Sequence, residues 1–182
     1  MKRFFWLLLI LEALLAGSAH AEKADTDKPT NVEADQMAYD DIKQINTFTG
    51  NVVLTRGTLT MRAHKMIVTQ DPAGYQYATL IATPGSVATF RQKRDSGPNQ
   101  WVEGQAERIE YDGKTEVAKL FNRARIRRLE GAKVTDEVEG EFISYDSHAE
   151  FFTVNNAPAG AGKPGSGRIR AVIQPRSEAK EK

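Results

Sequence analysis

Ala34-Asp35-Gln36-Met37-Ala38-Tyr39 is the first copy of a six-residue pattern that organises the whole chain. The pattern is a small residue, two mostly polar residues, an apolar residue, any residue, and then an aromatic or β-branched residue. Three more copies follow: Ala63-His64-Lys65-Met66-Ile67-Val68, Ala106-Glu107-Arg108-Ile109-Glu110-Tyr111 and Gly140-Glu141-Phe142-Ile143-Ser144-Tyr145. Because a short pattern that recurs within one small domain marks a reused supersecondary unit, the repeat predicts a stack of similar strand units.

The second half of each copy has the periodicity of a strand. Met37 and Tyr39 alternate with small or polar neighbours, as a strand with one buried face requires. The small residue at the start leaves room for a sharp bend or bulge, so we expect a corner there. Three copies continue with an aspartate that we expect at a turn, where its carboxylate caps the backbone: Asp40, Asp112 and Asp146.

A second element follows some copies and begins with Gly or Asn. Its occurrences are Gly50-Asn51-Val52-Val53-Leu54, Gly85-Ser86-Val87-Ala88-Thr89-Phe90 and Asn122-Arg123-Ala124-Arg125-Ile126. Gly and Asn tolerate positive φ, so the element predicts a hairpin turn followed by a strand, with 117–121 and 124–129 as one hairpin pair. No stretch has the pattern of a long amphipathic helix. The sequence therefore predicts an all-β fold, for which a generic antiparallel sheet is the simplest alternative.

The N-terminus has the features of a secretory signal. Lys2 and Arg3 precede an apolar run from Phe4 to Leu15, and Ala19-His20-Ala21 fits the small-x-small cleavage rule. This run of twelve residues, which unusually contains Glu12, is too short to cross a bilayer, which takes about twenty. We therefore expect a cleaved signal peptide (1–21), a flexible polar segment (22–28), a β-domain (29–175) and a charged tail (176–182), with the mature protein soluble outside the cytoplasm, where a bacterial envelope location fits.

Composition excludes several functional classes. The chain of 182 residues has no cysteine, so a disulfide framework and cysteine chemistry are impossible. Without residues 1–21 it carries 23 basic and 23 acidic side chains, and this neutral balance argues against nucleic acid as a partner.

Signals for catalysis or metal binding are weak. His64 occupies a polar slot of the repeat and is expected to be a solvated corner residue, and His148 has no neighbouring histidine. Residues 160–165 match G-x-G-x-x-G, but Pro164 stands where the helix would begin, so the match is false. Arg123, Arg125 and Arg127 alternate, which is typical of a solvated strand face, with a head-group contact as the minor alternative. We expect no catalytic residue, no metal and no cofactor.

Several segments in order resemble the OstA-like family of periplasmic lipopolysaccharide-transport proteins. They are Val32-Glu33-Ala34-Asp35-Gln36 after Pro29, Phe48-Thr49-Gly50-Asn51-Val52, Gly57-Thr58-Leu59, Ala63-His64-Lys65-Met66-Ile67-Val68-Thr69, Ala88-Thr89-Phe90-Arg91-Gln92, Val102-Glu103-Gly104-Gln105-Ala106 and Gly167-Arg168-Ile169-Arg170-Ala171-Val172-Ile173. The resemblance implies a twisted, open, V-shaped β-jelly roll of two antiparallel sheets that enclose an apolar groove. It also implies carriage of lipopolysaccharide, with its lipid A acyl chains in the groove.

The implied partners are an inner-membrane protein of the same fold, the periplasmic domain of the outer-membrane translocon, and further copies of this chain in head-to-tail stacks. The alternative is a periplasmic glycan-binding or glycan-cleaving jelly roll. Such a protein would need exposed aromatic platforms, for which the candidates are Trp101, Tyr75 and Tyr77.

The candidate groove residues are the large side chains on the predicted inner strand faces. They are Val32, Met37, Tyr39, Val52, Leu54, Leu59, Met61, Met66, Val68, Phe90, Ile109, Tyr111, Leu120, Ile126, Ile143 and Tyr145. For an arbitrary β-domain the same residues would fill a closed core, and the resemblance is what favours a lipid groove.

The first and last strands are the candidate partner edges, because they begin and end the fold and contain no proline. The first is Thr30 to Ala34, with Thr30, Asn31 and Val32 as its leading residues. The last is Arg168-Ile169-Arg170-Ala171-Val172-Ile173, whose alternation gives it one apolar face. We expect the last strand of one copy to pair with the first strand of the next copy or of a like-folded partner.

Overall fold

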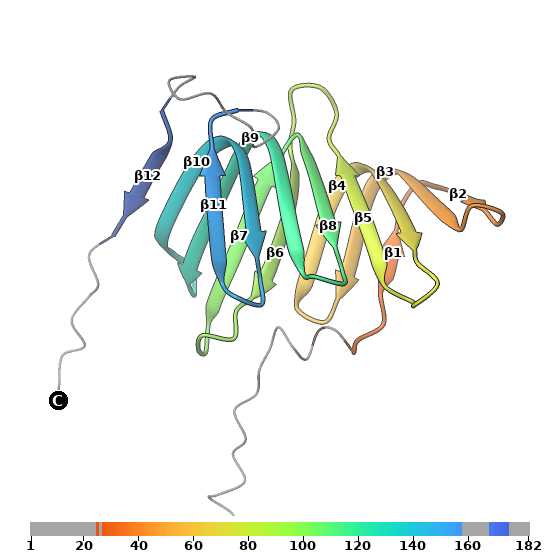
Figure 1. Cartoon of the computed structure of the whole chain (residues 1–182), viewed down its shortest axis with the longest axis horizontal. Helices are drawn as coiled ribbons and strands as arrows, with labels where there is room; N and C mark the ends of the chain where they lie inside the picture. The colour runs from red at the N-terminus through yellow and green to blue at the C-terminus, as the bar shows by residue number, and fades with distance from the viewer. Residues whose placement is uncertain (1–24, 26, 158–167, 175–182) are drawn as a thin grey trace, which may run out of the picture.

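The computed structural model describes residues 25, 27–157 and 168–174. The predicted signal peptide, the 160–165 glycine motif and the charged tail lie outside these residues. In the described part, twelve strands join in one antiparallel sheet (Figure 1): β1 (Asn31–Glu33), β2 (Gln36–Asp40), β3 (Ile45–Arg56), β4 (Leu59–Gln70), β5 (Gln76–Ile81), β6 (Ala88–Lys93), β7 (Gln100–Ala106), β8 (Arg108–Asp112), β9 (Val117–Glu130), β10 (Lys133–Asp146), β11 (Phe151–Asn155) and β12 (Arg170–Ile173).

The sheet is folded into two layers by its four longest strands. The first half of β3 pairs with β2 and its second half with β1, while β4 pairs first with β6 and then with β5. In the same way β9 pairs with β8 and then β7, and β10 pairs with β12 and then β11. Layer A contains β1, β6, β7 and β12, layer B contains β2, β5, β8 and β11, and the halves of the long strands complete both.

The repeated pattern marks the corners between the layers, as predicted. β1 continues into β2 through Ala34-Asp35, and β7 continues into β8 through Glu107. The N–H of Asp35 donates to the carbonyl of Gly50 at 3.0 Å, and the N–H of Glu107 donates to the carbonyl of Asn122 at 3.1 Å. At the first of these corners the Asp35 carboxylate also accepts a hydrogen bond from the side-chain amide of Asn51, at 3.0 Å. Backbone hydrogen bonds from residues of the repeat therefore link the corners of neighbouring strands.

The second sequence element was wrongly assigned to hairpin turns at two of its three occurrences, whereas Gly85 does lie in a turn, between β5 and β6. Gly50 (φ 81°) and Asn122 (φ 61°) do have positive φ, but both lie inside long strands, where β3 and β9 pass from one layer to the other. The expected hairpin of 117–121 and 124–129 is the single bent strand β9. The reason is that a positive φ can bend one strand as well as close a turn. Gly50 also lacks space for a side chain, since a Cβ would lie 2.2 Å from the Asp35 carboxylate.

The aspartates after the repeats cap turns, as predicted. Asp40 accepts from the N–H of Lys43 at 3.0 Å, and Asp146 accepts from the N–H of Ala149 at 2.8 Å. Burial acts to raise the pKa of Asp112, but the N–H groups of Thr115 and Lys114 outweigh it and hold that pKa below its ordinary value.

One residue of the segment expected to be flexible is anchored. Asp25 is 2% exposed, and its carboxylate accepts from the N–H of Thr58 at 2.7 Å and from the Thr58 hydroxyl at 2.6 Å. Gln92 approaches the same carboxylate at 3.4 Å. Asp25 is therefore held against the turn between β3 and β4.

Candidate functional site

The inner faces of the two layers carry continuous rows of apolar side chains. Strand register places them directly opposite one another across neighbouring strands. One row of layer B is Met37, Phe48, Met66, Leu80, Ile109, Leu120, Ile143 and Val154. One row of layer A is Val32, Leu54, Met61, Phe90, Gly104, Ile126, Val138 and Ala171. The layers meet face to face, since the rings of Phe90 and Tyr145 stack at 6.3 Å between centroids.

All sixteen candidate groove residues lie on these inner faces, in three degrees of burial. Val32, Val68 and Tyr111 are half-buried against the core, whereas Met37 is 61% and Tyr39 is 50% exposed. The others are at most 5% exposed: Val52, Leu54, Leu59, Met61, Met66, Phe90, Ile109, Leu120, Ile126, Ile143 and Tyr145. Their contact with lipid remains a prediction.

The interior is narrow in the middle. A cavity of about 20 Å³ lies between the layers, among Leu54, Leu59, Met61 and Tyr111. That is room for about one water, so an acyl chain enters only if the layers separate or side chains move. Gly104 contributes to the close packing, because the Phe90 ring occupies the place where its Cβ would lie, 2.0 Å away.

β2 and β12 lie at opposite ends of the long axis (Figure 1), and inner-face side chains are exposed at both ends. Ile173 on β12 is 78% exposed and Ile169, just before that strand, is 48% exposed, while Met37 and Tyr39 are exposed on β2. In the described part, β1 pairs only with β3 and β12 only with β10, so both strands keep one hydrogen-bonding edge free. These strands are shorter than the predicted 30–34 and 168–173.

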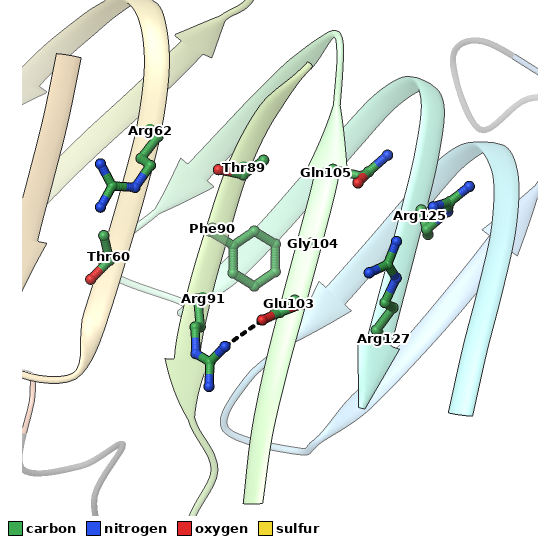
Figure 2. A pocket seen from close by; sticks show the side chains of 10 residues that line it. All are labelled: Thr60, Arg62, Thr89, Phe90, Arg91, Glu103, Gly104, Gln105, Arg125 and Arg127. Carbon is green, nitrogen blue, oxygen red and sulfur yellow. Dashed lines mark hydrogen bonds and ion pairs between the residues drawn. The ribbon is translucent and has the colours of Figure 1, made fainter. Parts of the chain in front are cut away.

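The outer face of layer A carries a polar hollow of about 380 Å³ (Figure 2). Its arginines alternate with acids: Arg91 pairs with Glu103 at 2.6 Å and Arg127 with Glu137 at 2.9 Å. Arg123, Arg125 and Arg127 thus lie on an outer face opposite Ala124 and Ile126, as their alternation predicts. The guanidinium carbon of Arg91 lies 4.4 Å from the ring centre of Trp101. The guanidinium therefore covers this candidate sugar platform.

Sequence analysis missed a set of inward-facing arginines. Arg56 follows Leu54 by two residues on β3, and Arg128 follows Ile126 by two residues on β9, so both share the inner face of layer A. Period two would have found them, but an arginine near a strand end is usually solvated. Arg56 donates to the hydroxyl of Tyr111 at 2.9 Å, which links the layers.

The two histidines that follow the predicted signal peptide are both exposed. His64 is exposed at its corner, as predicted, and His148 is exposed in a turn. No group of three or more His, Cys, Asp or Glu side chains could hold a metal ion within the described part. No helix among those residues is long and apolar enough to cross a membrane.

The fold and the interior define a class: two-layer antiparallel β-proteins whose apolar inner face runs from one free sheet edge to the other. Residues 31–151 match the family model "LptA/(LptD N-terminal domain) LPS transport protein". The chain therefore belongs to the LptA/LptD N-terminal-domain family of lipopolysaccharide transport proteins.

Relatives cover most of the chain. The lipopolysaccharide export system protein LptA of Haemophilus influenzae is 30% identical over 169 residues, which is 93% of this chain and 90% of that protein. LptA of Escherichia coli K12 is 35% identical over 140 residues, covering 76% and 71% respectively. The crystal structure of LptH, the LptA homologue of Pseudomonas aeruginosa, superimposes with a TM-score of 0.71 at 25% identity, covering 84% of this chain and 99% of that one.

Proposed function

We propose that this protein is a non-enzymatic periplasmic bridge that binds lipopolysaccharide and passes it from the inner membrane toward the outer membrane. The observation that carries the proposal is the continuous apolar inner face, buried in the middle and exposed on β2 and β12. Relatives named as lipopolysaccharide export proteins support the same substrate. A glycan-binding role has less support, because Arg91 covers Trp101.

Acyl burial supplies the main affinity in this proposal. Each buried CH₂ contributes roughly 0.8 kcal/mol, so ten carbons of one chain contribute about 8 kcal/mol before the entropic cost of binding. A surface ion pair contributes only about 0–1 kcal/mol. The lipid therefore offsets the cost of separating Phe90 from Tyr145 and similar contacts between the layers.

The free edges account for the partners. β12 of one copy pairs with β1 of the next copy, or with an inner-membrane or outer-membrane partner of the same fold. The exposed inner-face residues of β12 and β2 then meet, and the apolar path continues between molecules. Pairing of unlike edges is heterologous, so it extends a filament rather than closing a dimer.

A pair of equally exposed residues on opposite faces tests the lipid path. Met37 lies on the inner face and Phe151 on the outer face, and each is 61% exposed. A photo-crosslinking amino acid at Met37 should capture lipopolysaccharide during export, and the same group at Phe151 should not. Equal capture at both positions, or capture at neither, would contradict a lipid path along the inner face.

Purified protein without residues 1–21 provides the matching binding test. It should bind lipopolysaccharide saturably and should not bind the polysaccharide after its acyl chains have been removed. Retained affinity for the deacylated polysaccharide would favour the glycan-binding alternative.

A further inference from the structure

The edge of the interior opposite the corners, here called the mouth, is closed by side chains rather than by backbone. Arg56 of layer A donates to the hydroxyl of Tyr111 in layer B and lies 5.7 Å from the centre of that ring. Farther along the mouth, Arg128 of layer A lies 5.0 Å from the ring centre of Phe152 in layer B. Both contacts can break without unfolding a strand, because no ladder hydrogen bond depends on them.

Arg56 has no carboxylate partner among the described residues. It is half-buried, forms no ion pair with any described residue, and its Nε–H is buried without a hydrogen-bond partner. Asp25 lies near the turn that follows, but its carboxylate accepts from Thr58 and Gln92 instead. A partly buried guanidinium without a counter-charge is unfavourable, so its presence here points to a ligand.

The surroundings of Arg56 suit the junction between a charged group and acyl chains. Leu54, Leu59 and Met61 line the small cavity beneath the guanidinium, and these residues lead into the inner rows. Thr30 and Gln76 line the same cavity and are hydrogen-bonded to each other at 3.2 Å. The site thus offers one cation and neutral polar groups above an apolar floor.

We propose that Arg56 binds a phosphate of the amphiphile at the mouth of the groove. This inference rests on the proposed function and adds the position of the head group to it. The planar guanidinium has five N–H donors and matches phosphate geometry, and Tyr111 uses one of these donors in the unloaded protein. When the layers separate around a lipid, the Tyr111 contact is replaced by the phosphate, so the same side chain closes the empty groove and holds the loaded one.

Arg128 provides an internal control for this assignment. It faces inward in a similar setting and its Nε–H is likewise buried without a hydrogen-bond partner, but it donates to the carbonyl of Glu150 at 2.8 Å and lies opposite Asp136 in the strand register. Glu150 itself pairs with Arg94. The nearby carboxylates disfavour a second anion there, so Arg128 serves mainly as a contact between the layers.

The test measures affinity for lipid A with its phosphates and for lipid A without them, since both carry the same acyl chains. Wild-type protein should bind the phosphorylated form about tenfold or more tightly. Arg56→Gln should lose that preference while keeping its affinity for the dephosphorylated form within about twofold. Arg56→Lys, which keeps the charge, should retain part of the preference, and Arg128→Gln should retain all of it.

The outcomes separate this inference from the proposed function. If the wild type bound both lipids saturably and with equal affinity, the phosphate site would be wrong while the proposed function would stand. This outcome can be measured without any variant. Binding of neither lipid would overturn the proposed function as well. An equal loss of preference in Arg128→Gln and Arg56→Gln would show that closing the layers, rather than the charge of Arg56, sets the preference, and would overturn the assignment.

Discussion

The middle and the ends of the inner face carry the same kind of apolar side chain, but the opposite layer buries only those in the middle. Leu80, Ile109 and Leu120 of layer B are 0% exposed because layer A lies over them. Met37 belongs to the same register row but is 61% exposed on β2, and Ile173 on β12 is 78% exposed. The same kind of apolar side chain therefore stabilises the fold in the middle and is left without a partner at the ends.

Under the proposed function, that difference separates residues that serve stability from residues that serve binding. A buried side chain of this size contributes about 1.5–3 kcal/mol, whereas an exposed one contributes almost nothing to folding. In the proposed head-to-tail stack, a partner molecule would cover the exposed apolar residues at the ends of the inner face.

The largest effect should come from a charge placed in the middle. An open groove would tolerate Phe90→Asp, but Phe90 is 4% exposed, stacks on Tyr145 and fills the space over Gly104. Burying a carboxylate there without a partner should unfold the protein, which circular dichroism at 25 °C would detect. The matched change Phe151→Asp, on the outer face, should leave the spectrum and the melting temperature nearly unchanged. A folded Phe90→Asp protein would mean that the middle of the groove is open to water.

A smaller effect follows from removing apolar atoms within one row. Leu120→Ala should lower the free energy of unfolding by about 2–5 kcal/mol, because the cavity it leaves is enclosed by both layers. Met37→Ala, in the same row at the uncovered end, should change it by less than about 0.5 kcal/mol. Urea denaturation of both variants measures the contrast, and similar losses at the two positions would break the distinction between middle and ends.

The periodicity of the sequence predicted the strands, the inner-face residues and the corners. It did so because the repeat encodes each of these locally: alternation gives the face, and a small residue gives the bend, as at Ala34 and Ala63. The bent strands β3 and β9 were not predicted, because positive φ at Gly50 and Asn122 is equally compatible with a hairpin turn. Only the long-range partners of each strand half distinguish the two.

The state of the groove could not be predicted either. Sequence alternation says that Leu120 and Met37 face inward, but not how closely the opposite layer approaches each of them. The role of Arg56 was hidden for the same reason, since its contact with Tyr111 spans 55 positions in the chain. Distance between layers is a tertiary property that no local pattern specifies.

The smallest effect on stability, and the sharpest effect on assembly, should come from charges at the ends. Met37→Asp and Ile173→Asp each place a carboxylate where water already reaches, so the free energy of unfolding should change by less than about 0.5 kcal/mol. In a head-to-tail stack the same carboxylate would be buried against the apolar end of the next molecule, which costs on the order of kilocalories per contact. Light scattering at increasing concentration should therefore show growth for the wild type and monomers for either variant. Because each variant retains one intact end, mixing the two should give short assemblies but no filaments. Continued growth of the Ile173→Asp protein alone would mean that molecules associate through another surface.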